Sequence, residues 1–172
     1  AAWSAEGPGG VALKTDGPSV TVPDAADFER DERFTSALRI DPLLLEWDTA
    51  APRLAKAGYE VSADFSGKTM EEVQRFLRDW ARRMDALYVM VSLPPSFEYP
   101  AGTPCSRLID GAILPFCKES GLPFALMIGV KRGVNAALQL AGDGVGKPDL
   151  ASLQNLCSGH PDNQFLCTVL SR

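Results

Sequence analysis

The sequence contains a single histidine, His160, among 172 residues. A metal centre built on histidines, or a Ser-His-Asp triad, is therefore hard to assemble from this chain alone. The surrounding segment, Gly159–Asn163, has the composition of a turn, which predicts an exposed histidine without a catalytic role. A nucleophile elbow, a His-Glu-x-x-His motif and a carboxylate cluster with metal-ligand spacing are also absent from the sequence.

Basic residues are outnumbered by acidic ones, which gives a net charge of −5 and a pI of about 4.9. This balance argues against general binding to nucleic acids or to anionic membranes. No apolar run approaches the roughly 20 residues that cross a bilayer. The first residues also lack the basic flank and the apolar core that a signal peptide combines.

The cysteines are too far apart for a Cys-x-x-Cys metal or redox motif. They are Cys105, Cys117, Cys157 and Cys167. Three of the four have apolar neighbours, which predicts buried free thiols in a protein of the reducing cytoplasm.

The glycine-rich segment Gly142–Lys147 does not complete a nucleotide-binding motif. A Walker loop needs glycine where Ala141 stands and serine or threonine where Pro148 stands. The dinucleotide pattern would need glycine in place of Lys147, and no strand directly precedes the segment. We therefore expect an ordinary glycine-rich loop here.

The stretch Pro123–Asn135 dominates what the sequence does contain. It begins with a continuous apolar run, which predicts a strand buried on both faces, as in a parallel sheet covered by helices. Gly129 ends the run, and Lys131 and Arg132 follow it. In parallel α/β proteins, ligands bind at the carboxyl ends of the strands, where these cations would lie.

Other segments predict strands and helices in alternation. We expect strands over 35–41, 88–93, 123–129 and 164–170, and helices over 42–57, 69–87, 106–120 and 149–157. Less readable segments allow short strands at Val11–Leu13 and Val20–Val22 and a helix over 25–34. With 45% apolar residues, the chain can bury one sizeable core.

Several residues predict where the helices begin, bend and end. Asp41 is expected to cap the first helix and Pro52 to bend or split it. Thr69 and Glu72 form a capping-box pattern. Pro115 should kink the third helix.

Alternation of strands and helices predicts parallel strands with right-handed crossovers. Two closures fit this order: a small doubly wound sheet, or a partial (β/α)₈ barrel, since a complete barrel usually needs about 250 residues. We divide the chain into a glycine- and proline-rich segment, 1–33, and a barrel portion, 34–172. The second ends on a strand at the very end of the chain, which leads us to expect a piece of a longer protein.

Parallel strands would bring Arg39 to the same edge of the sheet as Lys131 and Arg132. Arginine offers a planar fork that matches a carboxylate. The alternative is that these cations form ion pairs with neighbours such as Asp41. The nearby acids, which are Asp41, Glu98 and Asp143, have no spacing that fixes them as a pair.

Five stretches resemble the uronate (glucuronate) isomerases of the amidohydrolase superfamily. They are Ala37–Leu44, Val91–Pro95, Phe124–Asn135, Leu140–Lys147 and Asp162–Arg172. The likeness runs in order through about residues 34–172, and residues 1–33 do not share it.

The resemblance implies a distorted (β/α)₈ barrel and an enzyme of cytoplasmic sugar-acid catabolism. It implies the isomerisation of D-glucuronate to D-fructuronate, or of D-galacturonate to D-tagaturonate, by a base and a divalent metal, usually zinc. The family's metal ligands have no counterpart here, and Met127 stands where some members have a histidine. Substrate contacts carry over to Arg39 and, less directly, to Arg132, with Lys131 beside it.

The resemblance further implies that this chain is inactive alone, and that its sheet edges favour aggregation or pairing with another chain, including a homo-oligomer. Its expected partner is a small sugar acid, without nucleic acid or membrane. Two alternatives remain: another metal-dependent hydrolase of the same superfamily, and a non-catalytic anion-binding α/β domain.

Overall fold

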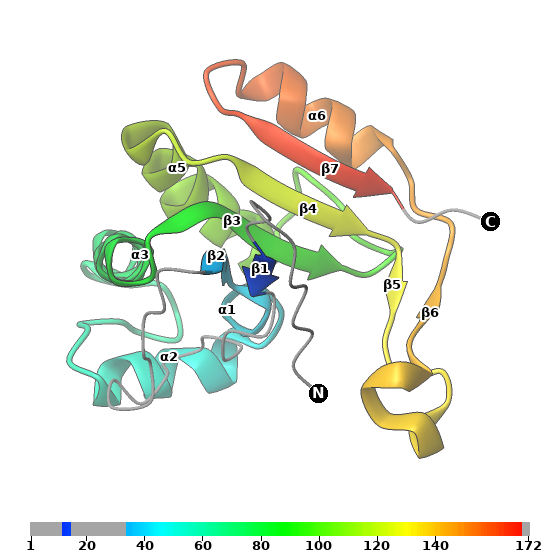
Figure 1. Cartoon of the computed structure of the whole chain (residues 1–172). Helices are drawn as coiled ribbons and strands as arrows, with labels where there is room; N and C mark the ends of the chain where they lie inside the picture. The colour runs from blue at the N-terminus through cyan, green and yellow to red at the C-terminus, as the bar shows by residue number, and fades with distance from the viewer. Residues whose placement is uncertain (1–11, 15–33, 170–172) are drawn as a thin grey trace.

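The computed structural model describes residues 12–14 and 34–169, and its main feature is a five-stranded parallel sheet (Figure 1). The strands are β1 (Ala12–Lys14), β2 (Phe34–Arg39), β3 (Ala86–Leu93), β4 (Phe124–Ile128) and β7 (Phe165–Val169). The helices of the connections are α1 (Asp41–Leu45), α2 (Trp47–Lys56), α3 (Thr69–Met84), α4 (Pro104–Leu108), the π-helical η1 (Ile109–Ile113), α5 (Leu114–Ser120) and α6 (Ala151–Gly159).

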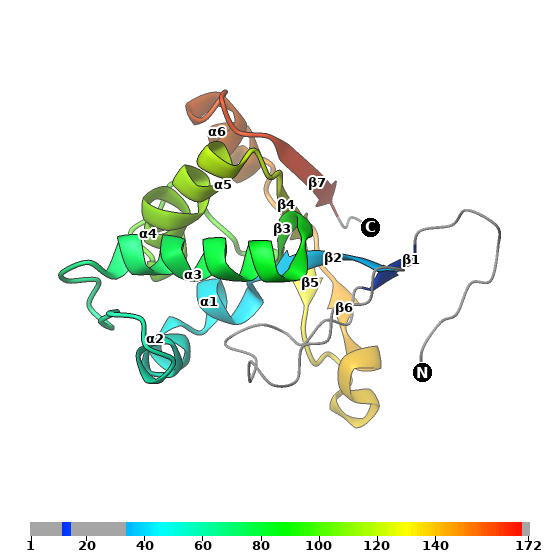
Figure 2. The same ribbon diagram turned by 60° about the vertical axis from the view of Figure 1, so that its left-hand side comes forward.

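The strands lie in the order β1-β2-β3-β4-β7, and every neighbouring pair is parallel. A doubly wound sheet reverses its strand order at one point, and this sheet does not. Right-handed crossovers without a reversal place the helices on one face of the sheet, and Figure 2 shows α3, α5 and α6 together on one side. The fold is therefore a portion of a (β/α)₈ barrel, and the doubly wound alternative is wrong.

The two faces of the sheet differ in burial. On β4, Phe124, Leu126 and Ile128 are buried against the helices, whereas Ala125 and Met127 are only half-buried. The prediction that this strand is buried on both faces is thus wrong in this chain. Side chains alternate along a strand, and only one face is covered by helices.

Strand β7 is an edge strand, and the prediction that it is buried is also wrong. Phe165 reaches the core, but Leu166 is 49% exposed and Val169 36% exposed. Within the described residues, β4 is its one neighbour in the sheet.

The first predicted helix divides earlier than expected. It separates at Glu46 into α1 and α2, and Pro52 lies inside α2 without breaking it. Asp41 is the first residue of α1 rather than its cap, because its carboxylate binds arginine side chains instead.

The capping box predicted for α3 does not form. Thr69 is the first helical residue, and its hydroxyl donates to the Ser66 carbonyl at 2.6 Å and accepts from the Ser62 amide. Glu72 accepts hydrogen bonds from the Glu60 amide and from Arg75. The preceding loop therefore uses both side chains that the helix would have used.

The helix predicted over 106–120 is perturbed near Pro115, as expected. It is observed as α4, the π-helical turn η1 and α5, and Pro115 lies in the first turn of α5. Because proline lacks an amide hydrogen, the carbonyl of Gly111, four residues earlier, loses its usual partner. The side-chain amide of Gln74 on α3 donates to that carbonyl at 2.9 Å. The helix irregularity is thus compensated from a neighbouring helix.

Replacing Gln74 by alanine is expected to lower the free energy of unfolding by about 1–2 kcal/mol, because a partly buried carbonyl loses its donor. Urea denaturation measures the change. Gln154→Ala, an exposed position on α6, is the matched control and should change stability by less than about 0.5 kcal/mol. Equal effects of the two substitutions would contradict this role for Gln74.

The four cysteines are free thiols, but they are not all buried. Cys117 is buried and Cys105 half-buried, whereas Cys157 and Cys167 are exposed. Burial raises the pKa of both the Cys105 and the Cys117 thiol to about 12. The prediction of buried thiols is therefore wrong for the two cysteines near the edge of the sheet.

Native chain treated with a thiol reagent at pH 8 should label Cys157 rapidly, Cys167 more slowly because partial burial and the nearby Cys157 raise the pKa of its thiol, and the other two cysteines only on unfolding. The thiolate is the reactive form, and burial suppresses it at Cys105 and Cys117. Mass spectrometry of labelled peptides distinguishes the four sites. Rapid labelling of Cys117 in the native chain would contradict its burial.

The strand predicted at Val11–Leu13 is present in part as β1. The strand predicted at Val20–Val22 lies outside the described residues, as does the helix predicted over 25–34 except for its last residue. That residue, Phe34, belongs to strand β2. Among the described helices, none combines the length and the apolar character needed to span a bilayer.

Candidate anion site

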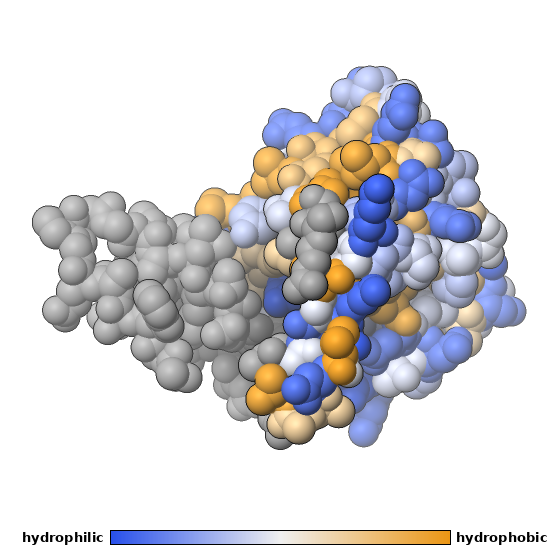
Figure 3. Space-filling model, turned by 90° about the vertical axis from the view of Figure 1, so that its right-hand side faces the viewer, coloured by the Kyte–Doolittle hydropathy of each residue, from blue (hydrophilic) through white to orange (hydrophobic). Residues whose placement is uncertain are grey.

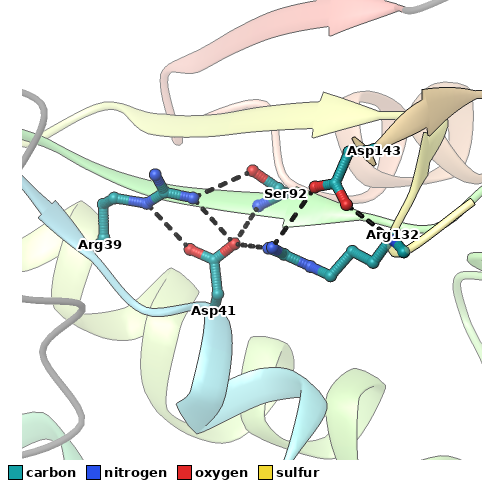
Figure 4. A network of polar contacts seen from close by, with 6 residues as sticks. Arg39, Asp41, Ser92, Arg132 and Asp143 are labelled. Carbon is teal, nitrogen blue, oxygen red and sulfur yellow. Dashed lines mark hydrogen bonds and ion pairs between the residues drawn. The ribbon is translucent and has the colours of Figure 1, made fainter. Parts of the chain in front are cut away.

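Polar side chains from separate strands meet at the carboxyl-terminal edge of the sheet (Figure 4). Arg39 ends β2, Asp41 follows it, and Ser92 lies near the end of β3. The register pairs Arg39 with Met90 and Ser92 with Met127, so the site residues of these strands share the face that the helices leave uncovered. Parallel pairing therefore builds the site from residues distant in sequence.

The carboxylate of Asp41 is the centre of this cluster. Its Oδ2 accepts a hydrogen bond from Nε of Arg39 at 3.2 Å, and its Oδ1 accepts one from Nη2 of Arg39 at 3.1 Å. Oδ1 also accepts from the Ser92 amide at 3.2 Å, and the Ser92 hydroxyl lies 3.3 Å from Nη2 of Arg39. The Asp41 side chain is 8% exposed, so the carboxylate is buried but well supplied with donors.

Arg132 reaches the same carboxylate through a change of chain direction after β4. Gly129 has a φ of 111°, a conformation that favours glycine. An antiparallel hairpin follows, formed by β5 (Val130–Lys131), the 3₁₀ helix η2 (Ala136–Gly142) and β6 (Gly144–Val145). Its base is closed by the hydrogen bond from the Gly146 amide to the Gly129 carbonyl, at 2.9 Å.

The hairpin positions Arg132 between two carboxylates. Nη2 of Arg132 lies 2.8 Å from Oδ1 of Asp41, and Nη1 lies 3.9 Å from Oδ2 of Asp143. Asp143 itself accepts a hydrogen bond from the Gly133 amide at 2.8 Å. The two arginines are therefore bridged by one buried carboxylate, with a second carboxylate at the outer side.

Of the predicted site residues, the structure brings Arg39 and Arg132 together and leaves Lys131 apart. Lys131 is exposed, its side chain makes no hydrogen bond or ion pair with any residue in the described ranges, and that side chain lies near Gly146. The alternative interpretation, ion pairs between these cations and Asp41, is confirmed for Arg39 and Arg132. Sequence reasoning missed Ser92, which carries no local signal.

The two guanidinium groups remain accessible although they are paired. The Arg39 side chain is 31% exposed and that of Arg132 48% exposed. Figure 3 faces this end of the molecule. Hydrophilic surface lies in the middle of the view, with a hydrophobic area above it, level with β7, and another below it, level with the hairpin tip. Two converging cations at an accessible edge make this cluster the candidate site for a small anion, and a carboxylate fits the planar guanidinium group best.

A deeper hollow lies elsewhere in the described structure. It has a volume of about 500 Å³ and is lined by residues of α1, α2 and the β3–α4 connection, including Leu44, Trp47 and Phe97. Its charged lining residues are Glu46, Asp48 and Glu98, so it holds carboxylates and no cation. The arginine cluster is therefore the better candidate for an anion, because charge rather than depth selects an anion.

His160 is not the exposed turn residue that the sequence predicts. Its Nε2 lies 2.7 Å from the hydroxyl of Tyr99, and that hydroxyl also binds the Asp110 carboxylate. Burial, and then the hydrogen bond to Asp110, raise the pKa of Tyr99. These three residues join the β3–α4 connection, η1 and the end of α6, on the helical side of the sheet.

No protein-family profile and no curated protein sequence matches the chain. Among solved structures, the chain is similar to a uronate isomerase from Bacillus halodurans C-125, with 45% sequence identity and a TM-score of 0.79. The match covers 82% of this chain and 33% of that one.

Two further structures share the fold at low sequence identity. A uronate isomerase from Thermotoga maritima is 11% identical with a TM-score of 0.64, and the match covers 81% of this chain and 38% of that one. A glucuronate isomerase from Caulobacter crescentus is 17% identical with a TM-score of 0.59, and the match covers 80% of this chain and 36% of that one. The chain thus spans about a third of the length of each of these three structures.

Proposed function

Because this chain is a relative of the uronate isomerases, we propose that it is one portion of an enzyme that interconverts an aldose and a ketose sugar acid. The substrates we propose are D-glucuronate or D-galacturonate, in the cytoplasm. Its own contribution is to bind the carboxylate of the substrate. The observation that carries this proposal is the convergence of Arg39 and Arg132 on one point at the strand ends.

The chemistry of a uronate explains why such a site is useful. Isomerisation moves a proton between C2 and C1, whereas the carboxylate is at the opposite end of the sugar, at C6. A pair of guanidinium groups that fixes C6 orients the reacting carbons without touching them, and orientation of this kind lowers the barrier to proton transfer. Arg39 and Arg132 thus act in binding and orientation.

The described residues do not fit the divalent metal that the family uses. They contain no group of three or more histidine, cysteine, aspartate or glutamate side chains that could hold a metal ion. Met127 offers a thioether on the open face, and His160 lies on the helical side, bound to Tyr99. In our proposal the metal, zinc, is held by parts of a longer protein outside this chain.

The test is an isomerase assay of the gene product translated from its full reading frame. With zinc present, it should convert D-glucuronate or D-galacturonate to the corresponding ketose, and a chelator should abolish the conversion. The 172-residue chain alone should bind the uronate without turnover. Absence of isomerisation by the full product with zinc would refute the proposal, and hydrolysis of an amide or ester instead would favour the hydrolase alternative.

A further inference from the structure

We propose that Asp41 is the positioning residue of the anion site and that it makes the site select a singly charged carboxylate over a doubly charged phosphate. This inference rests on the proposed function, because it concerns the same site. It assigns to Asp41 a role in specificity that the two arginines alone would not provide.

The contacts of Asp41 fix both arginines at once. Two nitrogens of Arg39 and one nitrogen of Arg132 bind a single carboxylate, at distances from 2.8 to 3.2 Å. The Ser92 amide holds that carboxylate in turn, at 3.2 Å. A buried group with four donors is far more rigid than an exposed arginine side chain, so Asp41 sets the distance and orientation of the two guanidinium groups.

Asp41 fixes the arginines without occupying their accessible sides. Within the described ranges, Arg39 uses Nε and Nη2 for Asp41 and Ser92, and Nη1 has no hydrogen bond. Arg132 uses Nη2 for Asp41, and the nearest carboxylate to Nη1 is that of Asp143, at 3.9 Å. The nitrogens that face away from Asp41 are those that an incoming anion would meet.

The charge of the site then favours a monoanion. Arg39 and Arg132 bring two positive charges, and Asp41 and Asp143 bring two negative ones, with Asp143 further away and partly exposed. A sugar carboxylate adds one negative charge, whereas a phosphate monoester carries about −1.5 to −2 at neutral pH. The second charge of phosphate would lie beside the buried Asp41 carboxylate, where solvent screens repulsion weakly.

The experiment compares two sugars of similar size by titration calorimetry with this chain: D-glucuronate and D-glucose 6-phosphate. The wild-type chain should bind D-glucuronate more tightly. Asp41→Asn should weaken D-glucuronate binding about tenfold, because the arginines lose their anchor, and should leave phosphate binding unchanged or strengthen it. The ratio of the two affinities should therefore fall at least tenfold. Asp162→Asn, in an exposed ion pair with Lys118, is the matched control and should leave both affinities unchanged.

A merely structural role for Asp41 would lower both affinities equally, and an unchanged ratio would overturn the inference. If Asp41→Asn fails to fold, Asp143→Asn is the second test, because it removes a negative charge from a partly exposed position of the same site. It should also shift the ratio of the two affinities towards phosphate. An unchanged ratio in Asp143→Asn would overturn the inference as well. Loss of isomerisation by the full gene product, with glucuronate binding and its selectivity intact, would refute the proposed function alone. A wild-type chain that binds neither sugar would refute both.

Discussion

Replacing Arg39 by methionine is expected to weaken the binding of D-glucuronate to this chain by about a hundredfold. A hydrogen bond to a charged group contributes about 1.5–3 kcal/mol, and loss of the contact with Nη1 together with the positive charge of Arg39 therefore costs about 3 kcal/mol. Methionine keeps a long side chain that can pack at the end of β2, so the change removes charge and donors more than volume. Titration calorimetry measures the loss directly.

Two variants separate the specific effect of Arg39 from general effects. Arg39→Lys keeps the charge but loses the planar fork, and should recover only part of the affinity. Arg78→Met, which breaks an exposed ion pair between α3 and α5, should leave binding unchanged. If Arg39→Met binds D-glucuronate as tightly as the wild-type chain, the anion is bound somewhere other than at this edge of the sheet.

The architecture could be predicted because it depends on patterns along the chain. Alternation of apolar runs and amphipathic helices predicts parallel strands, and the observed order β1-β2-β3-β4-β7 agrees with that prediction. Burial could not be predicted in the same way. The apolar run at β4 predicts two covered faces, and in this chain the face of Ala125 and Met127 is only half-covered, because covering depends on elements that the run itself does not encode.

The centre of the site could not be predicted because its contacts are distant in sequence. Asp41 and Arg132 are 91 positions apart, and their ion pair exists only once β2 and β4 lie in one sheet. The local pattern of Asp41 before Pro42 predicts a helix cap, and the tertiary contact with two arginines replaces that role. Ser92 participates through its backbone amide as well as its hydroxyl, and no side-chain pattern indicates an amide.

The difference between Lys131 and Arg132 shows a second limit of sequence reasoning. Both cations follow the same strand, and the sequence predicts one site for both, but consecutive residues of an extended chain point to opposite sides. Arg132 is directed towards Asp41, whereas Lys131 lies near Gly146 in the hairpin. Predicting which neighbour reaches the site requires the hairpin geometry after Gly129, which a pair of cations does not specify.

Replacing Phe76 by alanine is expected to lower the free energy of unfolding by about 3–5 kcal/mol, which is a large fraction of the stability of a single domain. Phe76 on α3 is fully buried, and its ring meets that of Tyr59 edge-on with centroids 5.5 Å apart. The substitution leaves a cavity at the contact between the helical layer and the sheet. The melting temperature should fall by on the order of 10 °C, and urea denaturation should show the same loss.

Leu166→Ala provides the matched control, because it also truncates an apolar side chain but on the uncovered face of β7. Leu166 is 49% exposed, so its loss should change stability by less than about 0.5 kcal/mol. A loss at Leu166 as large as that at Phe76 would mean that the face is covered in solution. Since a second copy of the chain would provide such a cover by mass action, the effect would then grow with protein concentration. A concentration-independent difference between the two variants would instead confirm that the helical side holds the core and that the face next to the anion site stays open.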